Sequence, residues 1–162
     1  MREIIDNIRT RLVGRRCWYV SAGGKVGATF SLAFGDRVLR KTPLANECHT
    51  EEFRRYEGEA NVYIWCTWRI DTPLEPLSSS DDSDENIESV LHSLVGCTVT
   101  SVNVDMPGWD LHLEFSSGVV LNVFCDHVPR EPSFDGNWEL HSQDLVLYFG
   151  PGARVEVENV ES

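Results

Sequence analysis

The chain has 162 residues, of which 41% are hydrophobic, including five tryptophans and seven phenylalanines. This is enough apolar material for one core, so we expect a single domain spanning residues 1–162. The 14 basic and 26 acidic residues give a net charge of −12, which repels nucleic acids and anionic membranes and leaves a basic protein as the compatible partner.

The start, MREIIDNIRTR, has no apolar signal core, and no apolar run approaches the roughly 18 residues of a membrane span, so we predict a cytoplasmic protein.

Two segments with the same apolar pattern predict two amphipathic helices. IIDNIRTRLVG ends at Gly14 and NIESVLHSLVG ends at Gly96, an offset of 96 − 14 = 82 residues. In each segment apolar residues recur at i, i+3 and i+7, and the final glycine suits a left-handed helix end. Ser83 or Asp84 is positioned to cap the second helix. The match is the first sign of an internal duplication.

Alternating apolar residues after each helix predict a three-stranded antiparallel meander. In the first half ATFSLAF precedes a turn at Gly35-Asp36, and in the second half LHLEF precedes Ser-Ser-Gly118. The later tryptophans Trp68, in WCTWRI, and Trp138, in NWEL, extend the match to a further strand. We therefore expect an α+β fold with an internal duplication of a helix followed by about four antiparallel strands, the two halves sharing one core.

The two repeats have different connecting segments. Repeat 1 covers about residues 2–72 and repeat 2 about 85–158, joined by an acidic linker rich in Pro, Ser and Asp at about 73–84. Within repeat 1, ECHTEEFRRYEGEAN predicts a short helix capped by Thr50 and ended by Gly58. The corresponding DHVPREPSFDG contains two prolines and predicts a loop.

The glycine-rich stretch SAGGKVGAT resembles a phosphate-binding loop but lacks its defining residues. Tyr19 stands where that loop needs its first glycine, and Val26 follows Lys25 where the loop needs Ser or Thr. The stretch also occupies the place of DMPGW in repeat 2. We therefore interpret it as a hairpin turn and not as a nucleotide site.

Five scattered cysteines, an odd number, favour reduced thiols over a disulfide framework. Cys48-His49 and Cys125-x-His127 have the chemistry of zinc ligands, but the closely paired cysteines of zinc sites are missing, so we predict no metal and no cofactor. A nucleophile pair of Cys125 with His127 or His141 has no marked oxyanion site, and we assign no catalytic residue. If the repeats enclose a pocket, its candidate lining residues are His49, Cys125 and His127.

An acidic cluster before and within the start of the second helix is the candidate partner-binding segment, comprising Asp81, Asp82, Asp84 and Glu85. These carboxylates can attract a basic protein, or they can serve only as a solvated linker and helix cap. The pattern of a calcium loop fails, because its central glycine and terminal glutamate are missing.

From Val62 onward the chain resembles a group of small uncharacterised bacterial proteins. The resemblance rests on the element Cys66-x-Trp-Arg-Ile70, on the hairpin Phe115-x-x-Gly-x-x-Leu121, and on Trp-x-Leu in NWEL. Some proteins of this group are candidate immunity proteins found beside secreted toxins, which implies a non-enzymatic inhibitor presenting an acidic surface to a protein partner. The alternative is a small-molecule-binding or enzymatic domain with a pocket between the two repeats.

Overall fold

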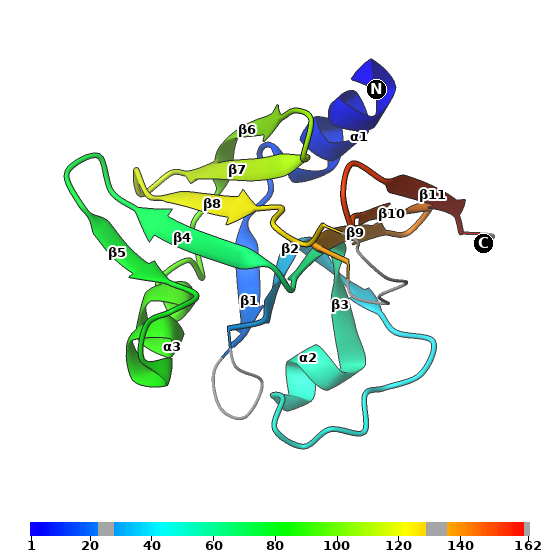
Figure 1. Cartoon of the computed structure of the whole chain (residues 1–162). Helices are drawn as coiled ribbons and strands as arrows, with labels where there is room; N and C mark the ends of the chain where they lie inside the picture. The colour runs from blue at the N-terminus through cyan, green and yellow to red at the C-terminus, as the bar shows by residue number, and fades with distance from the viewer. Residues whose placement is uncertain (23–27, 129–135, 161–162) are drawn as a thin grey trace.

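The computed structural model describes residues 1–22, 28–128 and 136–160, which form an α+β fold of two antiparallel sheets and three helices (Figure 1). The six-stranded sheet contains, in spatial order, β1 (Cys17–Ser21), β2 (Phe30–Leu39), β3 (Tyr56–Ile64), β9 (Trp138–Ser142), β10 (Leu145–Phe149) and β11 (Val155–Asn159). The five-stranded sheet contains β5 (Pro76–Ser79), β4 (Thr67–Asp71), β8 (Val120–Phe124), β7 (Asp110–Phe115) and β6 (Val99–Asp105). The helices are α1 (Arg2–Leu12), α2 (Glu51–Arg55) and α3 (Asp84–His92).

Each sheet combines strands from both halves of the chain. In the six-stranded sheet β3 pairs with β9, so that Val62 lies opposite Leu140. In the five-stranded sheet β4 pairs with β8, so that Ile70 lies opposite Leu121. The chain therefore crosses between the sheets twice, once from β3 to β4 and once from β8 to β9.

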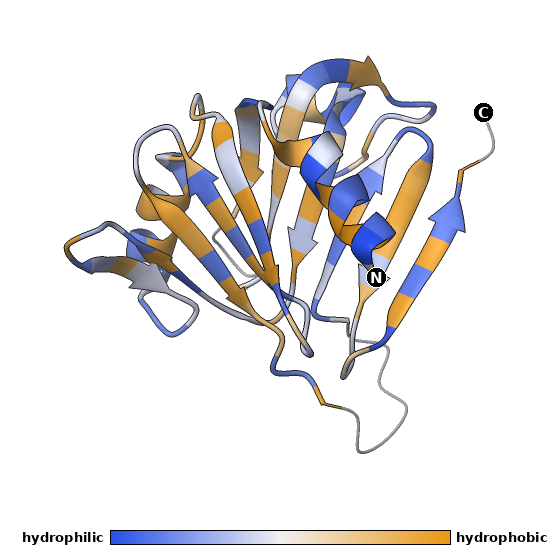
Figure 2. Ribbon diagram, turned by 90° about the horizontal axis from the view of Figure 1, so that it is seen from above, coloured by the Kyte–Doolittle hydropathy of each residue, from blue (hydrophilic) through white to orange (hydrophobic). Residues whose placement is uncertain are grey.

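The core lies between the two sheets. Phe34 of β2 and Phe115 of β7 approach across it with ring centroids 6.4 Å apart, and Phe30 of β2 meets Trp68 of β4 edge to face at 5.1 Å. Hydrophobic and hydrophilic residues alternate along the strands, as the colours of β11 show, and α1 lies between the two sheets in this view (Figure 2). The inward positions of both sheets belong to one cluster of buried side chains.

Both predicted amphipathic helices are confirmed. Gly14, which follows the C-cap of α1, has a φ angle of 80°, as expected for a glycine that ends a helix in the left-handed region. Gly96 has a φ angle of 91°, but α3 already ends at His92, and Gly96 closes the turn that follows it. The hydroxyl of Ser83 caps α3 by accepting a hydrogen bond from the backbone N–H of Asn86 at 3.3 Å. The internal duplication itself stays a prediction at this point.

The predicted turn at Gly35-Asp36 is wrong. β2 continues through both residues as one strand, and its register with β3 shifts between Phe34 and Arg37, which marks a bulge. Gly35 has a φ angle of 77°, and a Cβ atom there would collide with the side chain of Glu59. The Gly35-Asp36 pair thus marks a bulge within β2 and not a turn between two strands.

The short helix in repeat 1 is confirmed, although its end differs from the expected one. The backbone N–H of Phe53 donates to the Thr50 hydroxyl at 3.2 Å, which is the predicted cap. The helix ends at Arg55, because Tyr56 is already extended at φ −123°, and Gly58 lies inside β3. A Cβ atom on Gly58 would lie 2.7 Å from the backbone of Phe34, so this glycine permits close strand pairing instead.

Other expected connections fall in different places. The meander in repeat 2 is confirmed as β6, β7 and β8. Part of the expected linker, Pro76–Ser79, forms the edge strand β5. The glycine stretch at 23–27, which carries the hairpin-turn prediction, and residues 129–135 of the predicted loop lie outside the described residues.

Candidate functional site

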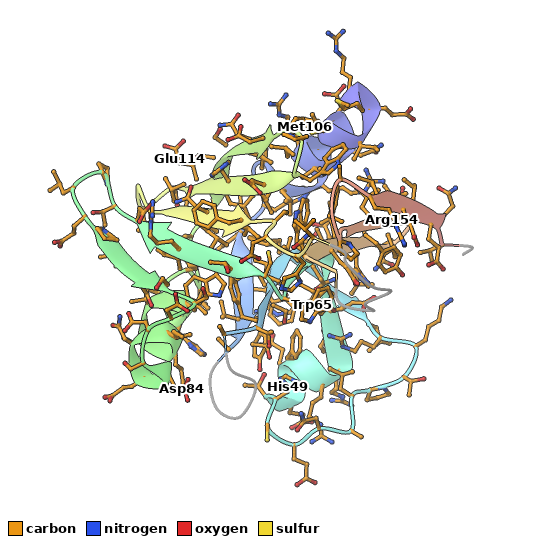
Figure 3. The ribbon with its side chains drawn as sticks, in the orientation of Figure 1. His49, Trp65, Asp84, Met106, Glu114 and Arg154 are labelled. Carbon is orange, nitrogen blue, oxygen red and sulfur yellow. The ribbon has the colours of Figure 1, made fainter. Side chains whose placement is uncertain are left out.

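An aromatic hollow of about 300 Å³ opens between the outer face of the six-stranded sheet and the segment that carries α2. Its lining includes the rings of Phe30, Phe53, Tyr63 and Trp65, together with Arg40, His49 and smaller residues. Figure 3 shows His49 and Trp65 on the side of the molecule that carries α2. A concave surface that combines aromatic rings with several polar side chains is typical of a binding site.

The segment that carries α2 places two rings of the hollow, Phe53 on the helix and His49 just before it. Phe53 is buried and stacks on Tyr19 of β1, with ring centroids 3.9 Å apart and planes inclined by 10°. The hydroxyl of Tyr19 and Nδ1 of His49 lie 3.2 Å apart, at hydrogen-bond distance. Burial, with a smaller effect of the Arg40 charge, lowers the pKa of His49, and burial raises the pKa of Tyr19. Both side chains are therefore neutral at pH 7, and the hydrogen bond between them joins two uncharged groups.

Arg40 supplies a fixed positive charge at the wall of the hollow. Its Nε donates to the carbonyl oxygens of Phe53 and Tyr56 at 3.1 and 3.2 Å, and one terminal nitrogen donates to the carboxylate of Glu57 at 3.1 Å. The guanidinium also lies over the Phe53 ring, 4.8 Å from its centroid. The other terminal nitrogen is buried without a partner among the described residues. This side chain is held rigidly, which fixes the position of α2 against β3.

A row of aromatic rings and carboxylates continues from the hollow across the outer face of the same sheet. Residues paired directly across strands share a face, and the pairs join Tyr63 to Glu139, Glu139 to Tyr148, and Tyr148 to Glu156. We call this surface the aromatic–carboxylate face; it comprises Tyr63, Trp65, Glu139, His141, Tyr148, Glu156 and Glu158.

The rings of this face contact one another. Tyr63 stacks with Trp65 at 6.1 Å between centroids and meets His141 edge to face at 4.8 Å, and His141 approaches Tyr148 at 6.0 Å. Nε2 of His141 lies 2.6 Å from the carboxylate of Glu139. Trp65 remains 38% exposed, which is unusual for so large an apolar ring. The arrangement offers stacking surfaces and negative charges to a ligand that carries positive charge.

The residues predicted to line a pocket are not brought together in this hollow. His49 lines it, whereas Cys125 and His127 follow β8 and do not belong to its lining. The thiol of Cys125 donates to the Trp109 carbonyl at 3.2 Å, and Nδ1 of His127 lies 3.0 Å from the Gly136 carbonyl. A zinc site is not formed either, because no three His, Cys, Asp or Glu side chains of the described chain lie together in positions to hold a metal ion.

All four carboxylates of the predicted acidic segment are exposed, and Asp82 is the one held by several hydrogen bonds. Asp82 accepts hydrogen bonds from the Ser83 backbone at 2.8 Å, from the Ser78 hydroxyl at 3.2 Å and from the side chain of Asn86. These bonds, chiefly the one from Asn86, lower the pKa of Asp82. Asp81 precedes α3, whereas Asp84 and Glu85 lie in its first turn, and Figure 3 shows Asp84 at that helix, apart from His49 and Trp65.

A second hollow of about 540 Å³ lies where the segments that follow α1 and α3 meet, and residues of both halves line it. Its charged lining residues include Arg15, Arg16, Arg37 and Glu59. Arg37 is engaged with Glu52 and lies 4.6 Å from the Trp18 ring centroid, and Arg15 is 3.7 Å from Glu59. The 540 Å³ hollow is therefore lined by charged groups, of which Arg15, Arg37 and Glu59 already have partners within the protein. A further hollow of about 700 Å³, between the segment after β2 and the turn between β9 and β10, is also lined by both halves.

Sequence reasoning missed the aromatic–carboxylate face and the charge distribution behind it. Residues 1–72 carry 12 basic and 9 acidic side chains, a net charge of 12 − 9 = +3, whereas residues 73–162 carry 2 and 17, a net charge of 2 − 17 = −15. The acidic excess therefore belongs to the second half, which supplies Glu139, Glu156 and Glu158. A separate charge count for each half is the signal that would have directed attention there.

Comparisons with protein-family models, with curated protein sequences and with solved structures give no match to this chain. No helix in the described part of the chain has the length and apolar character needed to cross a membrane. The site must therefore be interpreted from its own geometry and chemistry.

Proposed function

We propose that the protein is a non-enzymatic binding protein that receives basic side chains of a protein partner on the aromatic–carboxylate face. The observation that carries this proposal is the cross-strand row in which aromatic rings alternate with carboxylates, from Tyr63 to Glu156. Lysine and arginine side chains bind between such groups through cation–π contacts and charge-assisted hydrogen bonds. An exposed tryptophan beside the row supplies the kind of ring that dominates interface energies.

The charge distribution supports the same kind of partner. The acidic second half, with its net charge of −15 counted above, accelerates the approach of a basic protein by about 10- to 1,000-fold at low salt. An intracellular inhibitor of a basic toxin fits this chemistry, in line with the resemblance noted from the sequence. The acidic segment beside α3 then acts at long range, while the aromatic–carboxylate face makes the contact.

We also infer that the fold is internally duplicated, because equivalent hydrogen bonds recur at the sequence offset of 82. The Gly14 N–H donates to the Val99 carbonyl at 2.8 Å, and the Gly96 N–H donates to the Cys17 carbonyl at 2.8 Å. The Cys17 N–H donates to the Cys97 carbonyl, and the Val99 N–H donates to the Arg15 carbonyl, both at 2.9 Å. Within each pair, adding 82 to the donor's residue number and subtracting 82 from the acceptor's converts one hydrogen bond into the other.

Two buried tryptophans support the duplication. The indole N–H of Trp68 donates to the Ala28 carbonyl at 2.7 Å, and that of Trp138 donates to the Trp109 carbonyl at 3.0 Å. Each acceptor lies two residues before the first residue of an aligned apolar series, Phe30 in β2 and Leu111 in β7. The two indoles thus perform the same structural task in the two halves.

A second candidate function is the binding of a small molecule in the aromatic hollow. Its volume of about 300 Å³, its stacked rings and the neutral Tyr19–His49 pair favour an uncharged or weakly anionic planar ligand near Arg40. This candidate requires no protein partner, so the two functions predict different outcomes in one experiment.

The experiment is capture of a partner from the cells that encode the protein, followed by affinity measurement with purified partner and three variants. The face variant combines Trp65→Ser, Tyr148→Ser and Glu156→Gln; the segment variant combines Asp81→Asn, Asp84→Asn and Glu85→Gln. The control variant combines Met106→Ser and Glu114→Gln, which alter exposed residues on the β6–β7 side (Figure 3).

We expect the captured partner to be basic and the face variant to weaken binding at least about tenfold, which corresponds to about 1.4 kcal/mol. The segment variant should mainly slow association at low salt, and the control should bind as the wild type does. Unchanged affinity of the face variant would refute the proposed contact surface. Failure to capture any partner, together with binding of a planar small molecule that His49→Ala weakens, would favour the second candidate.

A further inference from the structure

The two segments that cross between the sheets meet at a pair of cysteines. Cys66 lies between β3 and β4, where the chain passes from the six-stranded to the five-stranded sheet. Cys125 follows β8, where the chain begins its return to the six-stranded sheet. A bond between these residues would join the two crossovers directly.

The register of β4 and β8 places the two cysteines opposite each other. The pairs run from Asp71 with Val120 to Thr67 with Phe124, and one further step in the same register aligns Cys66 with Cys125. Residues directly opposite in an antiparallel pair have Cα atoms about 4.5–5.5 Å apart, within the roughly 4.4–6.8 Å that a disulfide requires.

Further contacts hold the two segments together beyond the last strand pair. The backbone and hydroxyl of Thr67 both donate to the carboxylate of Asp126. The N–H of Cys66 donates to the Asn137 carbonyl, and the N–H of Cys125 donates to the Asp110 carboxylate. Neither cysteine N–H is bonded to the other cysteine, so they resemble a non-hydrogen-bonded pair, in which side chains approach most closely. The nearby Cys66 thiol, followed by burial, raises the pKa of Cys125, as expected for two thiols that lie side by side.

We propose that Cys66 and Cys125 form a reversible cross-strand disulfide when the protein meets a low-molecular-weight disulfide, and that they are a redox modification site. Cys125 is half-buried and Cys66 is only 3% exposed, so the small disulfide reaches Cys125 first. The raised pKa of Cys125 keeps its thiolate scarce, so the reaction is slow at neutral pH and faster at alkaline pH. The thiolate of Cys125 attacks the small disulfide, forms a mixed disulfide and releases one small thiol. The thiolate of Cys66 then attacks the sulfur of Cys125 and releases the second small thiol. The protein loses two hydrogens and two electrons, and the small disulfide gains them.

The other cysteines have different environments. Cys48 is exposed, so it can form a mixed disulfide with the reagent or with a second molecule. Cys17 is fully buried, and burial raises the pKa of its thiol to about 12, although it lies close enough to Cys97 for their charges to interact. The pair Cys17–Cys97 is therefore the competing disulfide that an experiment must distinguish.

The test treats the folded Cys48→Ser protein with oxidised glutathione and then maps the disulfides by mass spectrometry with peptide fragmentation. We expect two of the four remaining thiols to disappear, a fragment linking Cys66 to Cys125, and recovery of both thiols on reduction with dithiothreitol. The matched control Cys48→Ser/Cys97→Ser should form the same link, whereas Cys48→Ser/Cys66→Ser should form none.

Three outcomes would overturn the proposal. The first is a link between Cys17 and Cys97 in place of the proposed one. The second is glutathione that stays attached to Cys125 and is not displaced by Cys66. The third is no loss of thiols while circular dichroism shows that the protein stays folded. Because the mapping uses a chain that retains both proposed cysteines, poor folding of the Cys66→Ser variant does not affect the conclusion.

Discussion

Replacing Trp138 by phenylalanine should destabilise the fold through one identifiable hydrogen bond and one small cavity. The indole is fully buried, stacks on Phe149 with centroids 3.8 Å apart, and donates to the Trp109 carbonyl at 3.0 Å. Phenylalanine keeps a ring for stacking but removes the donor. The Trp109 carbonyl then keeps only the weaker thiol donor of Cys125, so the lost indole bond costs about 1 kcal/mol. The lost ring atoms add about 1 kcal/mol for the cavity, giving a total of about 2 kcal/mol.

The assay is urea unfolding followed by both tryptophan fluorescence and far-UV circular dichroism. If the two halves are equivalent, Trp68→Phe, which removes the bond to Ala28, should cost a similar free energy of unfolding. The control Trp65→Phe changes a 38% exposed ring and should alter stability by less than about 0.5 kcal/mol. A loss below about 1 kcal/mol for Trp138→Phe, or an equal loss for the control, would refute this reasoning.

Three further predictions test other parts of the fold. Gly150→Ala should lower the melting temperature more than Gly118→Ala. Both glycines have positive φ angles, but only at Gly150 would the new Cβ collide with another side chain, that of Asn137. Equal shifts of the melting temperature would contradict this. Asp82→Asn should destabilise the protein at pH 7, because the folded pKa of Asp82 lies below the ordinary 3.8. The stabilisation from this carboxylate is present above 3.8 and is lost as the pH falls through the folded pKa. The melting temperatures of variant and wild type should therefore converge in acid. Forming the proposed disulfide closes a loop of 125 − 66 + 1 = 60 residues and should raise stability by up to about 4 kcal/mol, measured by calorimetry with and without reductant.

Local sequence patterns predicted the elements whose stabilising contacts are near in sequence. The helices α1 and α3 follow from apolar spacing, and the cap at Thr50 follows from its hydroxyl and the helix after it. The bulge at Gly35-Asp36 was misread because a glycine-aspartate pair between apolar runs is equally suited to a turn and to a kinked strand. The distinction depends on β3, which pairs on both sides of the bulge.

The strand β5 was missed for a similar reason. Its composition, with Pro76 at its start and serines after it, is typical of a linker. An edge strand tolerates proline, because one side of its backbone needs no partner. Only the pairing with β4 shows that this segment belongs to a sheet.

The candidate site was predictable only in part. His49 was named from its chemistry and does line the aromatic hollow. Tyr63 and Glu139 attracted no attention, because they are 76 residues apart (139 − 63) and become neighbours only through the pairing of β3 with β9. Such a row cannot be derived from local periodicity, since it depends on the register between distant strands.

The interleaving of strands from both halves has a consequence for synthesis on the ribosome. After β3 is complete at Ile64, the strand that covers its free edge does not begin until Trp138, which is 138 − 64 = 74 residues later. At about 5–20 residues per second, that edge waits roughly 4–15 seconds for its partner. During this interval the nascent chain exposes unpaired backbone groups beside large aromatic side chains, the condition under which aggregation competes with folding. A chain that terminates before Trp138 should therefore accumulate as insoluble or chaperone-bound material, and not as a folded first half.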